Sequence, residues 1–335
     1  MGKRRRLLWW FAPLALVGAG ESLIAVLASR HEPPALKSRE TIWLRRTREI
    51  AAQAAPVDVV FLGDSTVERA IDDEFFSEQS GLTGLNLGLT GDLGTYGDYA
   101  ILKRYLKRLP APRAVVVWHA VDVWDRDVDP QLFGFTEPDV QDILVAMRRR
   151  LGDPRNAKGL VASPIAALGL VTHSGLMRIP SYRHRGWLRS VTGLASRDPA
   201  ELLGVNVPHR VLEEQVRQLG GASFHVSSEA HFWFGALVEL ARKHGTVVLA
   251  ARAPLHERFR SDPAVGEFIA ESNRVLTAFF AAQPGVVQLD RDNPVFTVDQ
   301  GYDDKDHVGP RGRRYLSDYY ARRLRERMSA PGSQP

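Results

Sequence analysis

The chain of 335 residues contains no cysteine. This absence excludes a disulfide framework, a thiolate metal site and a cysteine nucleophile. The sequence also lacks an internal repeat, the Gly-Lys-Ser or Gly-Lys-Thr of a phosphate-binding loop, and the glycine fingerprint of a dinucleotide site. Stability outside the cytoplasm would therefore depend on packing alone, and nucleophilic chemistry would depend on residues other than cysteine.

A concentrated basic surface is also missing, although the net charge is +5 and the pI is near 9.5. The excess positive charge is scattered, with Lys3 to Arg6 at the start of the chain and arginines near its end. A scattered excess suits an anionic surface or an envelope polymer better than DNA. We therefore expect no nucleic acid partner.

The N-terminal segment, residues 1–28, has the pattern of a membrane anchor. Lys3 to Arg6 precede the apolar run Leu7 to Ala28, which is long enough to span a bilayer with the N-terminus in the cytoplasm. A signal peptide cleaved after Ala28 is the alternative. The anchor is favoured by the length of the run and by Glu21, which lies near the far interface. Either reading places the rest of the chain outside the cytoplasmic membrane.

The remaining chain divides into a stalk with a helix, residues 29–55, and a domain, residues 56–328, followed by a disordered tail, residues 329–335. Apolar segments alternate with amphipathic segments through the domain, which predicts a parallel α/β sheet. The strands are expected near residues 57–62, 83–88, 113–119, 245–251 and 285–289. The helices are expected near residues 67–79, 96–109, 228–244, 263–282 and 310–327.

The third and fourth predicted strands are separated by residues 125–227, a gap too long for a simple crossover. It contains no clear strand pattern, so we interpret it as a helical insertion. Cationic and aromatic residues mix between Met177 and Trp187. Such a mixture could hold an anionic or sugar polymer, or it could form a solvated rim packed on the domain.

The first catalytic candidate is Ser65, which follows the apolar run Val57 to Leu62 in the sequence Gly63-Asp64-Ser65. A buried parallel strand ending there would deliver the serine to the sheet edge at which ligands bind. Asp and Ser are also ordinary helix N-cap residues, so a simple capping turn is the alternative.

The second candidate is the glycine-rich loop that follows Asn86, with glycines at 88, 91, 94 and 97. Free backbone N–H groups in such a loop can receive a developing negative charge.

The third candidate is the pair Asp304 and His307, just before a helix expected to start at Pro310. A serine nucleophile needs a base, and the base needs a carboxylate to hold its tautomer. A solvated acidic loop is one alternative. A metal site built on Asp303, Asp304, Asp306 and His307 is another, but no second ligand cluster accompanies it, so we expect no metal.

Together, Gly-Asp-Ser, Asn-x-Gly-x-x-Gly and Asp-x-x-His in this order resemble the SGNH or GDSL hydrolase superfamily, over roughly residues 57–124 and 228–328. The resemblance implies a three-layer α/β/α, flavodoxin-like fold with about five parallel strands. It also implies a Ser65–His307–Asp304 triad, with the N–H groups of Ser65 and Gly91 as oxyanion donors. The α/β-hydrolases share the order Ser, Asp, His, but their Gly-x-Ser-x-Gly motif is absent.

One family motif is altered after the third strand. The family has Gly-x-Asn-Asp there, with the asparagine as an oxyanion donor, whereas Val121-Asp122 stands in this chain. We expect His119 or a group from the insertion to substitute, or the enzyme to react slowly with water. Asp122 is expected to be structural and to hydrogen-bond the loop after Ser65, and Asn86 is expected to support the site.

An anchored domain of this kind looks like the envelope SGNH proteins of lipoteichoic acid D-alanylation and alginate O-acetylation. We therefore expect a cofactor-free, extracytoplasmic serine esterase or O-acyltransferase that acts on acylated envelope polysaccharide, with a membrane acyltransferase as a candidate partner. Hydrolysis and transfer use the same residues, so the sequence leaves both open. A non-catalytic envelope protein that binds glycan or scaffolds an assembly is the alternative, because the oxyanion asparagine is missing.

Overall fold

The structure is a computed structural model that describes residues 39–53, 55–128, 223–296 and 306–329, together with residues 136, 138 and 142. Nearly all of them belong to one of two compact units, formed by residues 42–129 and 198–335. The predicted membrane segment, most of the predicted insertion and nearly all of the predicted tail lie outside the described residues. Within these described ranges, no helix is both long and apolar enough to cross a membrane.

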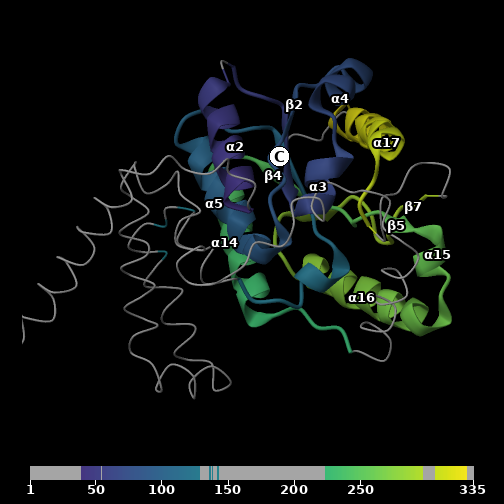
Figure 1. The fold of residues 1–335 in the computed structure, drawn as a ribbon. Coiled ribbons are helices and arrows are strands. Elements are labelled where there is room, and N and C mark those ends of the chain that lie inside the picture. Colours follow the sequence, from purple (N-terminus) through teal and green to yellow (C-terminus); the bar gives the residue numbers. More distant parts are fainter. Residues whose placement is uncertain are drawn as a thin grey trace, which may run out of the picture. The chain divides into compact units, whose positions relative to one another are not determined.

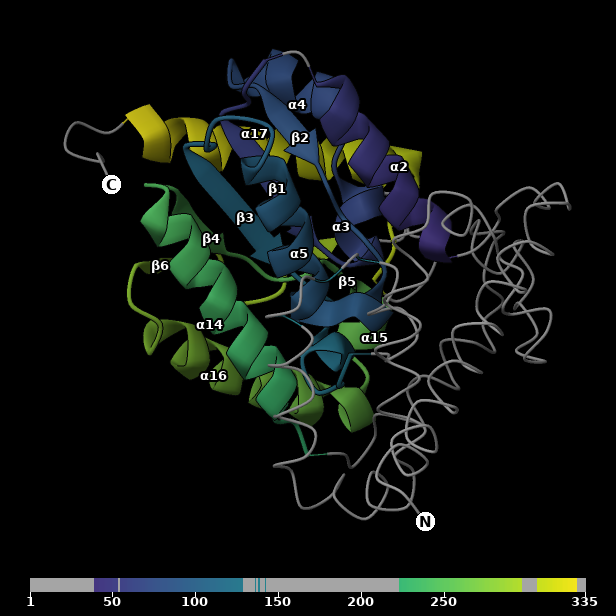
Figure 2. The same cartoon turned by 90° about the vertical axis from the view of Figure 1, so that its left-hand side faces the viewer.

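Five parallel strands form the central sheet, which lies among the helices in Figure 1. Figure 2 shows their order, β2-β1-β3-β4-β6. This is the 2-1-3-4-5 order of flavodoxin-like doubly wound folds. The prediction of an α/β fold with about five parallel strands is therefore confirmed. The bounds of the strands are β1 (Val59–Gly63), β2 (Gly84–Asn86), β3 (Ala114–Trp118), β4 (Val247–Ala250) and β6 (Val286–Gln288).

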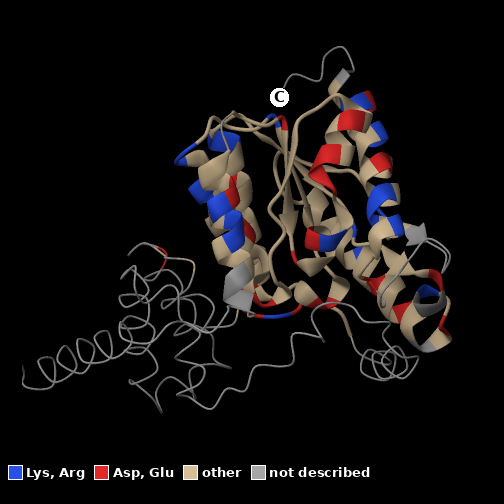
Figure 3. Ribbon diagram, turned by 45° about the horizontal axis from the view of Figure 1, so that its top comes forward, with Lys and Arg blue, Asp and Glu red and all other residues tan. Residues whose placement is uncertain are grey.

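The central strands are apolar because helices cover both faces of the sheet. Every residue of β1 and of β3 is buried. Figure 3 shows the uncharged strands between two groups of helices that carry the charges. On one face, Phe61 and Trp118 share a core with Phe76, Leu316 and Tyr320.

The first helical layer consists of α3 (Ser65–Ala70), α4 (Asp73–Ser80) and α17 (Pro310–Ser329). The opposite layer contains α5 (Gly94–Leu106) and α14 (Ser228–Lys243), which lie in front of the sheet in Figure 2. There Tyr96 packs on Trp233 with ring centroids 4.8 Å apart. Phe280 on α16 (Pro263–Ala281) contacts Phe234 of α14 at 5.3 Å.

The remaining regular elements are shorter or lie at the edges of the fold. Two strands that the sequence analysis did not predict form a separate small parallel sheet. These elements are α2 (Arg39–Ala52), β5 (Leu255–His256), α15 (Glu257–Arg260), β7 (Val295–Phe296) and the 3-10 helices Gly91–Leu93 and Val121–Val123.

The single helix predicted for residues 67–79 is wrong, because the structure has α3 and α4 in its place. Ile71 is extended, with φ −111° and ψ 126°, and ends α3. Asp72 then starts α4 by accepting a hydrogen bond from the Phe75 N–H at 3.1 Å. The break leaves Ser65 at the start of a helix of only six residues.

Helix α2 lies in the segment that the sequence analysis assigns to a stalk with a helix. Its side chains Trp43 and Ile50 are only 2% and 1% exposed. From Ile42 onward the helix belongs to the same compact unit as the sheet. This part of the segment therefore packs into the core instead of standing apart from it.

Candidate active site

Ser65 is placed by a sharp turn at the end of β1. Gly63 has φ +145°, a conformation that side-chain-bearing residues rarely adopt. A Cβ atom at this position would clash with the carbonyl oxygen of Trp118 on the neighbouring strand. The absent side chain lets the chain pass β3 closely and deliver Ser65, partly exposed, to the carboxyl edge of the sheet.

Asp64 fixes this turn. Its Oδ1 accepts hydrogen bonds from the Thr66 N–H at 2.9 Å and from the Thr66 hydroxyl at 2.5 Å, which caps α3. Its Oδ2 accepts the N–H of Ala120 at 2.8 Å. The capping role that the sequence allowed is therefore confirmed for Asp64. The same carboxylate ties the turn before Ser65 to the loop after β3.

His307 meets Ser65 from the other end of the chain. The Ser65 Oγ lies 2.8 Å from His307 Nε2, although 242 residues separate the two in sequence. His307 lies just before α17, and its side chain is 21% exposed. With its proton on Nδ1, this histidine would accept the serine proton at Nε2, the arrangement of a nucleophile and its base.

Among the residues that the structure describes, Asp306 lies beside this histidine. Its Oδ1 is 3.1 Å from His307 Nδ1, within ion-pair distance but without the geometry of a hydrogen bond, and its side chain is only 3% exposed. The sequence analysis named Asp304 for this position, and Asp304 lies outside the described residues. Nothing in the sequence distinguished Asp306 apart from its place next to His307.

Two backbone N–H groups, those of Ser65 and Gly91, are the donors predicted for an oxyanion. Ser65 is the first residue of α3 and Gly91 the first of a 3-10 helix, so neither N–H has a partner within its own helix. Gly91 lies near the turn that precedes Ser65, since a Cβ at this residue would be 3.8 Å from the Asp64 Cβ. Val121, which stands where the family has asparagine, is buried and offers no side-chain donor.

His119 is a buried histidine directly after β3. Its Nε2 lies 2.6 Å from Asp98 Oδ2 on α5, with both side chains 1% exposed. Burial opposes the charge on His119, but the neighbouring Asp98 outweighs it and raises the pKa of His119 above its usual value. The Nε2 atom is thus engaged with Asp98, which leaves only Nδ1 for the oxyanion contact considered for His119.

Asp122 forms an ion pair with Arg126. We expected Asp122 to secure the loop after Ser65 by a hydrogen bond. A hydrogen bond between the loop after β3 and the turn at Ser65 is made by Asp64, which accepts the Ala120 N–H. The role expected for Asp122 stays a prediction.

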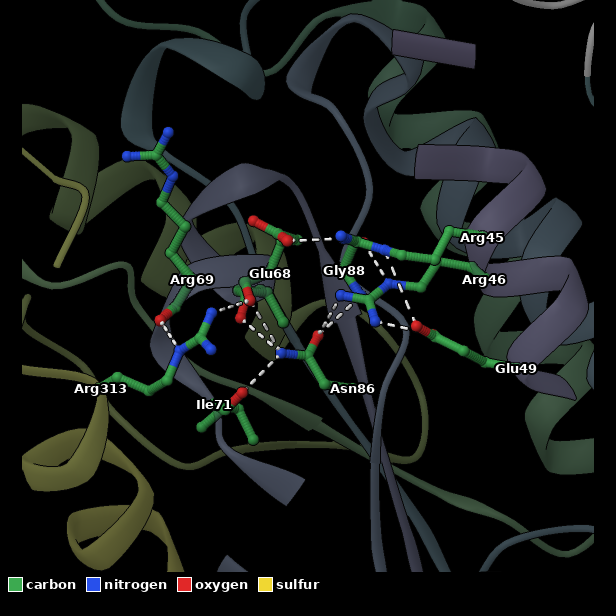
Figure 4. Close-up of polar contacts among 10 residues, drawn as sticks. Arg45, Arg46, Glu49, Glu68, Arg69, Ile71, Asn86, Gly88 and Arg313 are labelled. Carbon is green, nitrogen blue, oxygen red and sulfur yellow. Dashed lines mark hydrogen bonds and ion pairs between the residues drawn. The ribbon is translucent and has the colours of Figure 1, made fainter. Parts of the chain in front are cut away.

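Asn86, at the end of β2, lies against α3, the helix that begins with Ser65 (Figure 4). Its Nδ2 donates to the carbonyl oxygens of Val67, Glu68 and Ile71 at 3.0, 3.2 and 2.9 Å. Its Oδ1 accepts the Gly88 N–H at 2.9 Å. Asn86 therefore connects the glycine-rich loop to the end of α3.

The described part of the chain contains no group of three or more His, Asp or Glu side chains arranged to hold a metal ion. His225 instead pairs with Asp125 at 2.9 Å, and His231 packs on the ring of Phe279. Of the four residues considered for a metal, Asp303 and Asp304 lie outside the described ranges.

The fold and this site define a doubly wound α/β protein with a serine and a histidine in contact at the carboxyl edge of its sheet. Comparison with models of protein families and with curated proteins finds no match. Among solved structures, the chain is similar to a GDSL-like lipase from Bacteroides thetaiotaomicron, with 12% identity and a TM-score of 0.38. The match covers 87% of this chain and 100% of the lipase chain.

Proposed function

We propose that the chain is a serine hydrolase or acyltransferase of SGNH type, with Ser65 as nucleophile and His307 as general base. The observation that carries the proposal is the 2.8 Å contact between Ser65 Oγ and His307 Nε2. The order of the three sequence motifs supports it independently.

In this mechanism His307 takes the Ser65 proton while Oγ attacks the carbonyl carbon of an ester. The resulting oxyanion receives hydrogen bonds from the backbone N–H groups of Ser65 and Gly91. When the carbon–oxygen bond to the leaving alcohol breaks, that alcohol takes the proton from His307 and an acyl-serine remains. Water or a sugar hydroxyl then gives its proton to His307 and attacks the acyl group. As the bond between the acyl group and Oγ breaks, His307 returns that proton to Ser65.

A carboxylate at Nδ1 would hold His307 in the required tautomer and stabilise its charged form. Asp306 is the carboxylate in contact with Nδ1, at 3.1 Å. Asp304 stays the candidate that the motif Asp-x-x-His predicts.

The substrate and location that we propose come from the sequence. The apolar run Leu7 to Ala28 would hold the domain on the outer side of the cytoplasmic membrane. There the substrate would be an acylated envelope polysaccharide, and a membrane acyltransferase would be a partner that supplies or consumes the acyl group. Water and a sugar hydroxyl would compete for the same acyl-serine.

A panel of acylated envelope polysaccharides and free sugar acceptors tests this proposal. The chain should release or transfer acyl groups from at least one donor, and Ser65→Ala should abolish both reactions. Retention of the full rate in Ser65→Ala would exclude Ser65 as nucleophile.

A non-catalytic envelope protein is the alternative. One observation favours it: the side chain of Val121 provides no hydrogen-bond donor for an oxyanion. It predicts no acyl chemistry on any donor of the panel. It also predicts binding to anionic glycan that weakens as salt is added.

A further inference from the structure

Arg46 on α2 is a buried cation that reaches from outside the sheet into the glycine-rich loop (Figure 4). The residue is 6% exposed. Its Nε donates to the carbonyl oxygen of Gly88 at 3.0 Å, and its Nη2 donates to Asn86 Oδ1 at 3.4 Å. Its Nη1 pairs with Glu49 at 2.8 Å. Each nitrogen of the guanidinium thus has a different partner.

Gly88, which Arg46 holds by its carbonyl, is fixed on its other sides too. Its N–H donates to Asn86 Oδ1 at 2.9 Å. A Cβ at residue 88 would clash with the backbone nitrogen of Glu68, so the loop lies directly on α3. The next residue, Leu89, donates its N–H to Gly63 at the end of β1, at 2.8 Å. The loop enters the site two residues later, at Gly91.

The end of α3 is held by the same group of residues. Asn86 donates to two of its carbonyl oxygens and to that of Ile71, the residue that follows it. From the opposite side, Arg313 on α17 donates to the carbonyl oxygens of Arg69 and Glu68 at 2.7 and 3.2 Å. Asn86 is therefore the point at which Arg46 connects to the helix that begins with Ser65.

The geometry of these contacts requires a guanidinium. Its planar fork reaches Gly88 and Asn86 together, whereas the lysine ammonium is a single point charge. Removal of the side chain would leave the Gly88 carbonyl without this buried donor and would open space behind the loop. A displacement of about 1 Å in a catalytic group can lower a rate about 100-fold.

We propose that Arg46 is a positioning residue of the active site, which fixes the loop bearing Gly91 relative to the helix that begins with Ser65. Helix α2 is then part of the machinery for acyl transfer. The inference rests on the proposed function, because it assigns Arg46 a role in the reaction of Ser65.

The test compares Arg46→Ala and Arg46→Lys with Arg48→Ala in the full chain. Arg48 is an exposed arginine on the same helix, so it controls for loss of charge from α2. The readouts are the rate of fluorophosphonate labelling at Ser65 and, with an ester substrate, kcat and KM separately. Circular dichroism reports the folded fraction of each variant.

Both Arg46 variants should label about tenfold to 100-fold more slowly, with kcat reduced to match and KM changed less than about twofold. Ethylguanidinium should restore part of the rate in Arg46→Ala at an unchanged folded fraction. Arg48→Ala should behave as the wild type. A purely structural role would lower the folded fraction without changing the rate per folded molecule.

Three results would overturn the inference. If Arg46→Lys folds and labels at the wild-type rate, Arg46 has no positioning role, and the proposed function is unaffected. Failure of both Arg46 variants to fold assigns the residue to stability instead of positioning. Absence of labelling in the wild type, by contrast, overturns the proposed function and the role of Arg46 with it.

Discussion

His307 Nε2 lies 2.8 Å from Ser65 Oγ, and this contact joins the first strand of the sheet to the last helix of the chain. The two segments are also joined behind the contact. Arg313, in the first turn of α17, donates to the carbonyl oxygens of Glu68 and Arg69 on the helix that begins with Ser65. The Arg313 contacts therefore hold the start of α17, three residues after His307, beside the helix that begins with Ser65.

Comparison of two variants, Asp306→Asn and Asp304→Asn, tests which carboxylate supports His307. Asp306→Asn should slow fluorophosphonate labelling by about 100-fold or more, because an amide at Nδ1 stabilises neither the required tautomer nor the imidazolium. Asp304→Asn is the matched variant. An unchanged Asp306→Asn together with an inactive Asp304→Asn would give the role to Asp304, as the motif predicts.

A substitution at Gly63 tests whether the close approach of β1 to β3 positions Ser65. Gly63→Ala should lower the free energy of unfolding by about 3 kcal/mol or more, because its Cβ would clash with the Trp118 carbonyl oxygen. Gly81→Ala is the control. Gly81 also has a positive φ, but a Cβ there meets nothing within 4 Å. Gly81→Ala should therefore lower the free energy of unfolding by only about 1 kcal/mol. Urea unfolding measures both, and equal losses would contradict the argument.

The pKa of Asp73 predicts the direction in which the free energy of unfolding changes with pH. Burial raises the pKa of Asp73 from 3.8 to about 6, while the Asn86 backbone N–H and Arg46 act against this rise. Between these values the folded chain binds more protons than the unfolded chain. The contribution of Asp73 to stability is therefore full below about pH 4 and is lost as the pH rises through about 6.

Asp73→Asn should remove this dependence. The difference between the two pKa values corresponds to about 3 kcal/mol, and the partial exposure of the residue lowers the expected effect to about 1–2 kcal/mol. Urea unfolding at pH 4 and at pH 7 should show the variant gaining stability relative to the wild type at the higher pH. Glu74→Gln, an exposed neighbour, should show no such change. A difference between Asp73→Asn and wild type that stays constant with pH would refute the shift.

The fold could be predicted because its pattern is local. Apolar runs near residues 57–62 and 113–119 match the buried strands β1 and β3, since a parallel strand covered on both faces needs no polar alternation. The break at Ile71 could not be predicted in this way. It depends on Asp72, which caps α4, and on the Asn86 Nδ2, which donates a hydrogen bond to the Ile71 carbonyl oxygen from a different element of the fold.

The candidate site could be predicted in part. Ser65 and His307 belong to motifs with recognisable spacing, and the structure brings these two together. Arg46 carried no signal, because an arginine on a charged helix looks like a solvated residue until the sheet is assembled around it. Asp64 looked like a turn residue, and its bond to Ala120 exists only once β1 and β3 are paired.

The central claim, that Ser65 is a nucleophile activated by His307, is tested most directly by fluorophosphonate labelling followed by intact mass and peptide mapping. The wild-type chain should gain one adduct, on Ser65. Ser65→Ala should gain none, and His307→Ala should label at least about 100-fold more slowly. A folded wild-type chain that gains no adduct, or a Ser65→Ala variant that labels like the wild type, would contradict the account.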